Sequence, residues 1–311
     1  MKKVLLIYGG LSSEHDVSIK SAKSIEKHID KNKFDLTKLY ITKNNEWLVN
    51  NKKIDNIIDF LNRFDVVFPI THGKYGEDGK LQGLLDFFNL KYVGSKCGSS
   101  YIAMDKIRTK QILSYYHIPQ VPYQIYKKKD KLIIPYPVII KPANGGSSIG
   151  ISVANNKKEF KKGLKEALKY DENIIVEKFI KGQELECAVL EDKNIITSTI
   201  GEIKSANTFY DYEAKYENKE SKLIIPANID NNISNKIKEY SKQIFKMLDL
   251  KDLSRIDFFY DKENDKIYLN EINTLPGFTD ISMYPMLLDD IGINYQDLIT
   301  KLLYNAIKRP N

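Results

Sequence analysis

The sequence predicts an α/β protein, in part α+β, with more than one domain. The chain opens with a short apolar strand pattern that runs into two glycines and then into a helical pattern. Further strand-like runs alternate with helical stretches up to about residue 95. Later runs alternate apolar and polar residues and are joined by glycine-rich or turn-rich segments, as antiparallel strand pairs are. A length of 311 residues allows two or three domains.

Composition and cysteine usage indicate a globular protein of a reducing compartment. A hydrophobic content of 42%, with 13 Phe and 20 Tyr, is enough for a sizeable core. Cys97 and Cys187 lack a neighbouring thiol or a metal-ligand spacing. The apolar start is too short for a signal peptide, and no run approaches the length of a membrane span. We therefore expect a soluble, cytoplasmic protein that uses no membrane.

The net charge of +7 does not indicate a nucleic-acid partner. It arises from 48 Lys+Arg against 41 Asp+Glu, with lysine clusters at Lys127–Lys131 and Lys157–Lys162. Acidic residues are interleaved with the lysines, and no motif of aromatic and basic residues is present. A solvated surface is the better interpretation.

The first predicted unit is a strand, a glycine loop and a helix. KVLLIYGG reads as a buried strand, and Val17, Ala22, Ile25 and Ile29 follow at helical spacing. Such a loop offers backbone amides to an anion, but the absence of GxGxxG argues against a dinucleotide. Glu14 lies in this loop and can pair with a ligand ammonium or supply charge to the helix N-terminus.

The runs FDLTKLYIT, DVVFPITHG and KYVGS predict further strands of a largely parallel sheet, with helical stretches at 54–62 and 81–88. His72 follows the second of these runs, at the carboxyl end of a strand, where open α/β sheets carry ligands. The alternative is a loop imidazole that caps the next helix. The position of His72 at the end of a strand favours a functional role over this alternative.

A loop rich in glycine and serine is predicted after a helix and a strand in the middle of the chain. A helix is predicted from Ser99 and is expected to end at Pro119. VIIKPANGGSSIGISV then reads as a strand that ends at Lys141, a flexible loop and a second strand. Free amides and hydroxyls at 145–148, with a lysine at the base, are typical of a flap that covers phosphate.

The segment ENIIVEKFIKGQELECAVL predicts a pair of strands around an IKGQ turn, and isolated charges there are usually solvated. The stretch 201–227 is the least regular part of the chain, with four aromatic residues, and is predicted to be a lid. Lys215 and Tyr216 are expected to be the residues of this lid that reach the bound ligands. Helices are predicted at 233–250 and 295–306.

The hairpin RIDFFYDKENDKIYLNEINT predicts a metal site. If it is symmetric about Asn264, Asp257 lies opposite Glu271 and Arg255 opposite Asn273. Two opposed carboxylates repel each other unless a cation lies between them. Two carboxylates and an amide suit Mg²⁺ or Mn²⁺, and Mg²⁺ bound by few protein oxygens completes its shell with substrate phosphates.

A surface hairpin with solvated acidic residues is the alternative, and the tail that follows favours a site. In LPGFTDIS, Gly277 lets a backbone amide approach a ligand closely and Ser282 offers a hydroxyl. Arg255 adds a fixed cation for a phosphoryl group.

An ordered set of motifs resembles one known family. GGLSSEHDVS, HGKYGEDGKLQG, YVGSKCGSSYIAMDK, VIIKPANGGSSIG, EKFIKGQE, TFYDYEAKY, RIDFF and NEINTLPGFTDIS are similar to successive motifs of the D-alanine–D-alanine ligases of the ATP-grasp superfamily. The set spans nearly the whole chain. It implies an ATP-dependent ligase that joins two D-alanine molecules through an acyl phosphate, for peptidoglycan precursor synthesis.

The resemblance also implies three domains, with ATP held between the second and third. These are an N-terminal α/β domain at 1–98, a central ATP-grasp subdomain at 99–180 and a C-terminal subdomain at 181–311 with a lid at about 203–226. A homodimer is expected, and the small molecules ATP and D-alanine are the expected partners. The expected ATP-binding residues are Lys106, Lys141, Ser147, Ser148, Glu177, Lys178, Phe179, Ile180, Glu184, Tyr210 and Lys215.

The remaining roles follow from the same motifs. Asp257, Glu271 and Asn273 are expected to bind two Mg²⁺ or Mn²⁺ ions. Glu14 is expected to hold the ammonium of the first D-alanine, and Ser282 and Met283 to line the second site. Arg255 and the Gly277 amide are expected to stabilise the oxyanion of the tetrahedral intermediate. The candidates expected to accept the amine proton are the Tyr216–Ser147–Glu14 set and His72.

Three other functions stay open at this point. The first is a relative that joins D-alanine to D-serine or D-lactate. The second is another ATP-grasp carboxylate–amine ligase with a different acid. The third is a nucleotide-binding sensor without catalysis.

Overall fold

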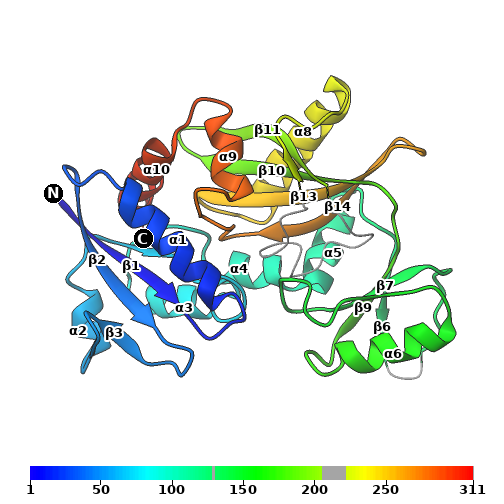
Figure 1. Cartoon of the computed structure of the whole chain (residues 1–311), viewed down its shortest axis with the longest axis horizontal. Helices are drawn as coiled ribbons and strands as arrows, with labels where there is room; N and C mark the ends of the chain where they lie inside the picture. Colours follow the sequence, from blue (N-terminus) through cyan, green and yellow to red (C-terminus); the bar gives the residue numbers. More distant parts are fainter. Residues whose placement is uncertain (128–129, 205–221, 311) are drawn as a thin grey trace.

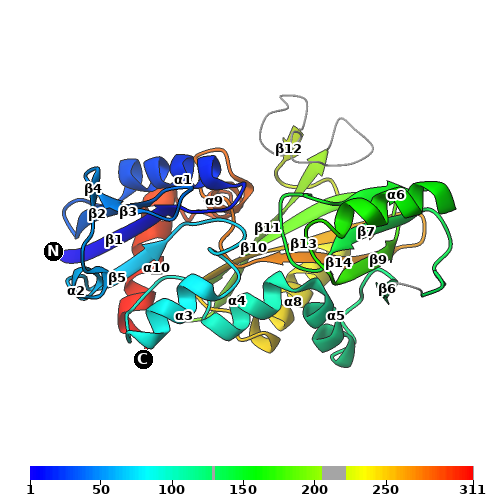
Figure 2. The ribbon, with the colours of Figure 1, turned by 90° about the horizontal axis from the view of Figure 1, so that it is seen from below.

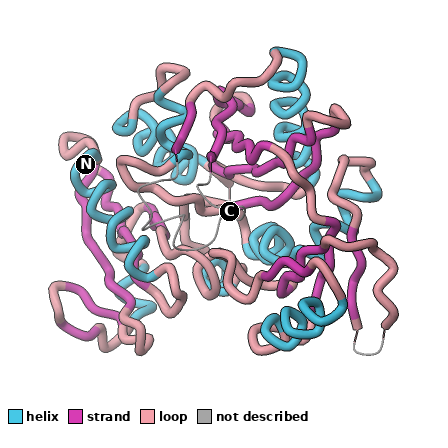
Figure 3. The backbone as a smooth tube through the Cα atoms, turned by 45° about the vertical axis from the view of Figure 1, so that its right-hand side comes forward, coloured by secondary structure: helices cyan, strands magenta, loops and turns pink. Residues whose placement is uncertain are grey.

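The computed structural model describes residues 1–127, 130–204 and 222–310. Within these ranges the strands form three sheets, each with helices beside it (Figures 1 and 3). In sheet order, the first is β4-β3-β2-β1-β5, the second β12-β11-β10-β13-β14 and the third β6-β9-β7-β8. No helix of the described residues is long and apolar enough to cross a membrane.

The first sheet is parallel at its centre, as predicted. Its strands are β1 (Lys2–Gly9), β2 (Phe34–Ile41), β3 (Trp47–Val49), β4 (Lys52–Lys53) and β5 (Val66–Pro69). Strand β1 pairs in parallel with β2 and β5, whereas β3 and β4 extend the sheet in antiparallel pairs.

The strand expected at KYVGS does not form. Only a single parallel bridge joins Val67 to Tyr92. Gly94 then takes a positive φ of 110°, and its amide donates to the carboxylate of Asp252 at 2.7 Å instead of to a strand. The chain therefore leaves the first sheet here.

Helices from both ends of the chain cover the first sheet. They are α1 (His15–His28), α2 (Ile57–Leu61) and α3 (Lys80–Phe87), with α10 (Tyr295–Lys308) from the end of the sequence. The helix before it, α9 (Met283–Asp289), packs on β10 and β11 of the second sheet instead. One apolar core joins Val4 and Phe68 of this sheet to Leu298 and Leu302 of α10. The last helix therefore packs beside the first strands, and the two termini lie at the same end of the molecule (Figure 1).

The single helix expected from Ser99 to Pro119 is two helices, α4 (Cys97–Met104) and α5 (Lys106–Tyr115). Asp105 separates them because its backbone is extended and its carboxylate caps α5, accepting from the amides of Ile107 and Arg108. Helix α5 ends before Pro119. Figure 2 shows α3, α4 and α5 in a row along one face of the molecule.

The third and second sheets are antiparallel throughout. The third contains β6 (Tyr123–Tyr126), β7 (Val138–Pro142), β8 (Ser152–Ala154) and β9 (Ile174–Lys178), with α6 (Lys157–Ala167). The second contains β10 (Gln183–Glu191), β11 (Ile195–Lys204), β12 (Lys222–Ile224), β13 (Leu253–Asp261) and β14 (Lys266–Asn273), with α8 (Asn231–Met247).

The strands of these two sheets confirm most of the predictions for the second half of the chain and show that two were wrong. The strand–loop–strand unit around the glycine and serine loop forms as β7 and β8. The strands on either side of IKGQ both form, but β9 and β10 belong to different sheets and are not paired with each other. Part of the stretch expected to be irregular is regular, because β11 extends to Lys204 and β12 begins at Lys222.

Candidate active site

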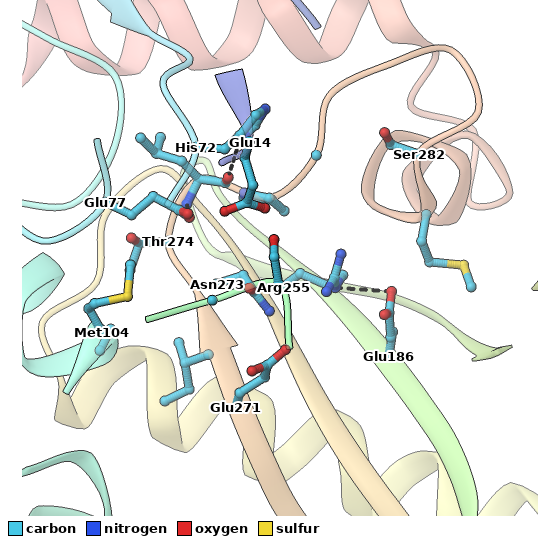
Figure 4. A pocket seen from close by; sticks show the side chains of 18 of the residues that line it. Glu14, His72, Glu77, Met104, Glu186, Arg255, Glu271, Asn273, Thr274 and Ser282 are labelled. Carbon is cyan, nitrogen blue, oxygen red and sulfur yellow. Dashed lines mark hydrogen bonds and ion pairs between the residues drawn. The ribbon is translucent and has the colours of Figure 1, made fainter. Parts of the chain in front are cut away.

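A cavity of about 220 Å³ lies where the three sheets meet. Its lining comes from the start of α1, the loops after β5 and β7, helices α4 and α5, the strands β10 to β14, and the segment 274–283. A smaller cavity of about 60 Å³ shares several of its walls and extends toward the third sheet. Figure 4 shows Glu14, His72 and Glu77 on one side of the main cavity and Arg255, Asn273 and Glu271 across from them.

Most residues predicted for the site line these two cavities. The larger contains Glu14, His72, Lys106, Ser147, Arg255, Glu271, Asn273, Gly277, Ser282 and Met283. The smaller contains Lys106, Lys141, Ser148, Glu184 and Glu271. Residues separated by up to 269 positions in the sequence, from Glu14 to Met283, are therefore brought to one place.

Several predicted residues do not line either cavity. Asp257 lies buried beneath Arg255, with only 7% of its surface exposed. The four expected adenine-site residues are also absent from both linings: Glu177, Lys178, Phe179 and Ile180. Tyr210, Lys215 and Tyr216, with most of the predicted lid, fall outside the described residues.

The β13–β14 hairpin has the predicted pairing. Arg255 is opposite Asn273, and Asp257 is opposite Glu271. Beyond this pair the register shifts by one residue, so Asn270 is the additional residue of a β-bulge. Both Asn270 and Glu271 consequently line the two cavities, and the Asn270 side-chain oxygen accepts from Lys141 Nζ at 3.2 Å.

Arg255 forms a two-pronged ion pair with Asp257. Its Nε and a terminal nitrogen donate to the two carboxylate oxygens, each at 2.8 Å, and Asn273 Nδ2 donates to one of them at 3.0 Å. Burial by itself lowers the pKa of the guanidinium, but the carboxylates of Asp257 and Glu186 outweigh it and raise the pKa above its ordinary value. Arg255 is therefore a permanent cation in the cavity.

The donor set fits a hard divalent cation that arrives with a ligand. Asp257, Glu271 and Asn273 offer only oxygen donors on one face of the hairpin. No group of three His, Cys, Asp or Glu residues among the described residues forms a complete metal site. Two carboxylates and an amide would fill only part of a coordination shell, a donor set that fits Mg²⁺ or Mn²⁺ completed by phosphate oxygens and water.

Glu177 is buried between two lysines. Its oxygens lie 2.8 Å from Lys110 Nζ and 2.7 Å from Lys141 Nζ, and the three side chains are at most 7% exposed. Burial raises the pKa of this carboxyl, but the two ammonium groups outweigh it and lower the pKa to about 2. The carboxylate holds Lys141 at the wall of the smaller cavity, and sequence reasoning missed Lys110.

The glycine and serine loop is held by Lys106 and contains two serines with left-handed backbone conformations. Lys106 Nζ donates to the carbonyl of Gly145 at 2.6 Å. Ser147 and Ser148 both have positive φ, at 54° and 58°, a conformation that favours glycine and often marks a functional loop. The buried Ser147 hydroxyl has no hydrogen-bond partner within the described part of the chain.

The Glu14 carboxylate occupies a notch between two glycines. A Cβ on Gly73 would overlap Glu14 Oε2, and a Cβ on Gly146 would lie 3.6 Å from it. Gly73 has a φ of +71°. Three loops from different parts of the sequence therefore meet at this carboxylate, which is half-buried at the N-terminus of α1.

His72 connects the loop after β5 to the 274–283 segment. Its Nδ1 lies 2.9 Å from the carbonyl of Leu275, and its Nε2 lies 3.0 Å from the hydroxyl of Ser21, which accepts from the amide of Phe278. These partners place the ring proton on Nδ1. Burial lowers the pKa of the imidazole, so it is neutral, and both nitrogens are engaged.

Glu77 is a site residue that sequence reasoning missed. It is 8% exposed and accepts from the amides of Gly73 at 2.7 Å and Leu275 at 2.9 Å. Burial, and then the charge of Glu14, raise its pKa to about 8. An acidic residue within the glycine-rich GKYGEDG run was the available signal.

The 274–283 segment presents a hydroxyl pair beside a glycine. Ser282 Oγ accepts from the amide of Thr279 at 2.9 Å and lies 2.8 Å from its hydroxyl. A Cβ on Gly277 would lie 3.1 Å from Ser282 Oγ, so the glycine keeps this corner open. Met283 packs against Gly201 of β11, where a Cβ would lie 2.7 Å from the Met283 sulfur.

Two family models match most of the chain. The model described as the D-ala D-ala ligase C-terminus matches residues 112–304, and the one described as the D-ala D-ala ligase N-terminus matches residues 3–60 and 52–95. A D-alanine–D-alanine ligase of Clostridium novyi (strain NT) is 43% identical over 340 aligned positions, which cover 100% of this chain and 99% of the relative. One from Acetivibrio thermocellus is 42% identical and covers 100% and 97%.

Solved structures give the same picture. A D-Ala:D-Ser ligase from Enterococcus faecalis superposes with a TM-score of 0.87 at 33% identity, covering 98% of this chain and 99% of that one. A D-alanine–D-alanine ligase from Coxiella burnetii gives 0.86 at 30% identity and covers 99% and 94%. A D-alanine–D-alanine ligase from Bacillus anthracis complexed with ATP gives 0.82 at 27% identity and covers 99% and 98%.

Proposed function

Because the chain belongs to the D-alanine–D-alanine ligase family, we propose that it joins two D-alanine molecules into D-alanyl-D-alanine at the expense of ATP, for peptidoglycan precursor synthesis. The reaction proceeds through an acyl phosphate, because a free carboxylate is a poor electrophile. The observation that carries this proposal is the convergence of the family motifs on one pair of adjoining cavities. The alternative acceptors D-serine and D-lactate are not favoured, since the two curated relatives described above are D-alanine–D-alanine ligases.

The smaller cavity suits the nucleotide phosphates. Lys106 and Lys141 bring two ammonium groups to its wall, and Ser148 lies in the loop beside them. Glu184 at the same cavity is assigned to the ribose. The adenine is assigned to the strip Glu177–Ile180; the Glu177 carboxylate is taken up by its two lysines, so that residue contributes backbone groups to the base.

The hairpin is assigned to the metal ions. Asp257, Glu271 and Asn273 would hold two Mg²⁺ or Mn²⁺ ions against the phosphates. Bound there, the ions would neutralise charge on the phosphoryl group during its transfer. The protein itself adds positive charge to both cavities that Glu271 lines, with Arg255 in the larger and Lys141 in the smaller.

The larger cavity suits the two amino acids. Glu14 holds the ammonium of the first D-alanine, and the Ser282 hydroxyl holds the carboxylate of the second beside Met283. Arg255 lies across the cavity from Glu14 (Figure 4), and the Gly277 amide lines the same cavity; these two groups are assigned to the oxyanion of the tetrahedral intermediate.

The second D-alanine must lose a proton before its amine attacks. Both ring nitrogens of His72 are engaged, so this residue orients the 274–283 segment rather than accepting the proton directly. The Tyr216–Ser147–Glu14 set is the better candidate. Ser147 has an unpartnered hydroxyl among the described residues, and Tyr216 falls outside them.

The remaining assignments rest on the family. We assign three domains with boundaries near residues 98 and 180. A lid near 203–226 would bring Tyr210 and Lys215 to ATP, and the protein would form a homodimer. The three sheets are consistent with this division, although α10 packs on the first sheet.

Phosphate release from ATP tests the proposed function. Purified protein is incubated with ATP, Mg²⁺ and a panel of D- and L-amino acids, with D-lactate included, and the product is identified by mass. The expected result is release that depends on D-alanine and a product with the mass of D-alanyl-D-alanine. Release without D-alanine, or a mixed product from D-serine or D-lactate at equal efficiency, would contradict it.

A further inference from the structure

Three carboxylates lie side by side across the second sheet, and Glu186 is the one that sequence analysis did not single out. Glu186 on β10 is opposite Asp257 on β13, which is opposite Glu271 on β14. Residues directly opposite each other in antiparallel strands share a face of the sheet. Arg255 precedes Asp257 by two residues and so projects from that face as well.

Arg255 touches two of these carboxylates at once. It donates to both oxygens of Asp257 at 2.8 Å, and its Nε also lies 3.0 Å from Glu186 Oε2. The side chains of Arg255, Asp257 and Glu186 are 16%, 9% and 6% exposed, so water screens these contacts little. Figure 4 shows the ion pair between Arg255 and Glu186 as a dashed line.

Asp257 cannot serve the guanidinium and a divalent cation equally well. A carboxylate offers about four lone-pair positions. Two are taken by Arg255 and one by Asn273 Nδ2. A divalent cation on the remaining position would lie close to the guanidinium, and like charges at short range repel strongly in a buried site.

We propose that Glu186 takes over the Arg255 guanidinium when a divalent cation binds Asp257, and so allows both positive charges to stay in the site. This rests on the metal role proposed above for Asp257, Glu271 and Asn273. Glu186 is then a positioning residue, which acts through Arg255 and contacts neither the metal nor the reacting atoms. Without Glu186, the guanidinium stays on Asp257 and competes with the metal.

Binding of Mn²⁺ tests this without a catalytic readout. Free and bound Mn²⁺ are separated by electron paramagnetic resonance, with a non-hydrolysable ATP analogue equimolar to the protein and a protein-free sample as reference. Glu186→Gln is expected to weaken Mn²⁺ binding by about tenfold or more, the usual effect of losing a partner that orients a metal ligand. Glu202→Gln is the matched control, expected to bind as the unchanged protein does.

The control makes the same chemical change on the opposite face of the same sheet. Glu202 on β11 is 3% exposed and directly follows Gly201, the residue opposite Glu186. Absence of saturable Mn²⁺ binding by the unchanged protein would overturn the metal site of the proposed function. Saturable binding that Glu186→Gln leaves unaltered would overturn only the role of Glu186.

A double-variant cycle separates action through Arg255 from plain negative charge. In an Arg255→Gln background no guanidinium competes for Asp257, so adding Glu186→Gln is expected to change the Mn²⁺ affinity less than about twofold. If Glu186→Gln lowers the Mn²⁺ affinity as much in this background as it does when Arg255 is present, Glu186 acts on the metal itself. That result would overturn the proposal.

A crystal structure with Mn²⁺ and ADP tests the proposal even if a variant fails to fold. The expected result is the Arg255 guanidinium hydrogen-bonded to Glu186 and separated from at least one oxygen of Asp257. A guanidinium still paired with both oxygens of Asp257, beside a metal bound to that carboxylate, would overturn it.

Discussion

Asp257 on β13 lies directly opposite Glu271 on β14, and the strand pairing shifts by one residue immediately beyond them. The bulge that results turns Asn270 and Glu271 toward the same pair of cavities. Opposed carboxylates destabilise a sheet unless positive charge lies between or beside them. Arg255 supplies one such charge to Asp257.

We predict that Glu271→Gln abolishes ligase turnover and leaves the fold intact. The amide keeps the shape of the side chain but removes the charge that a divalent cation requires, so kcat is expected to fall by about a thousandfold or more. The measurement is D-alanine-dependent phosphate release, with circular dichroism to verify folding. Glu263→Gln, in the exposed turn of the same hairpin, is the matched control and should retain full activity.

The Glu177 ion cluster predicts a loss of stability. Glu177→Gln removes the shared partner of two buried lysines, Lys110 and Lys141. Unpaired buried charge is costly, and we expect a loss of about 3 kcal/mol in the free energy of unfolding at pH 7, measured with urea. Glu166→Gln removes an exposed ion pair with Lys169 instead and should leave stability unchanged.

Acidification provides an independent check on this cluster. The folded-state pKa of Glu177 is about 2, below its ordinary value of 4.5, so its contribution is present above pH 4.5 and is lost as the pH falls toward 2. The Glu177→Gln variant should therefore lose less stability than the unchanged protein over that interval. Parallel losses would show that the cluster does not carry the acid sensitivity.

The raised pKa of Glu77 predicts that the free energy of unfolding falls as the pH rises, the opposite of the effect of Glu177. The folded-state pKa of Glu77 is about 8, whereas an ordinary glutamate titrates near 4.5. The folded protein then binds more protons than the unfolded chain between these values, so stability falls as the pH rises through that window, by up to about 1.4 kcal/mol per pH unit. Glu77→Gln cannot ionise and should have a flatter dependence from pH 5 to 8, measured by urea unfolding.

Glu46 provides the control for that experiment. It is exposed, in the loop before β3, so Glu46→Gln should follow the unchanged protein at every pH. If Glu77→Gln and the unchanged protein lose stability in parallel from pH 5 to 8, the carboxyl of Glu77 is already ionised in the folded state at pH 5.

The hairpin shows how far the sequence alone could predict the site. Alternation of apolar and polar residues predicted that Asp257 faces Glu271, on the assumption of symmetry about Asn264. The pairing is confirmed, but for a different reason. Asp261 pairs with Lys266, so the turn is centred half a residue earlier, and the bulge at Asn270 restores the predicted register. A bulge depends on tertiary packing and leaves little trace in a local pattern.

Features fixed by distant residues were the ones missed. Asp105 breaks the predicted helix because it bridges to Asn144 and caps α5, and a periodicity of apolar residues does not encode that contact. Glu77 and Glu186 become site residues only when Leu275 and Arg255 arrive from the end of the chain. By contrast, the Gly–Ser loop and the strands β1, β2 and β5 follow from local composition and were predicted correctly.

The contact between Met283 and Gly201 predicts a change in acceptor binding. A Cβ on Gly201 would lie 2.7 Å from the Met283 sulfur, and that side chain can move because its end is flexible. In Gly201→Ala the thioether is expected to shift toward the cavity that Met283 lines, where the second D-alanine is proposed to bind. We expect the KM for the second D-alanine to rise about tenfold, with a smaller change in kcat and a stability loss of about 1 kcal/mol.

Gly98→Ala, in α4 with open space around the added methyl, is the control and should leave both kinetic constants unchanged. An unchanged KM in folded Gly201→Ala would mean that Met283 does not bound the acceptor site.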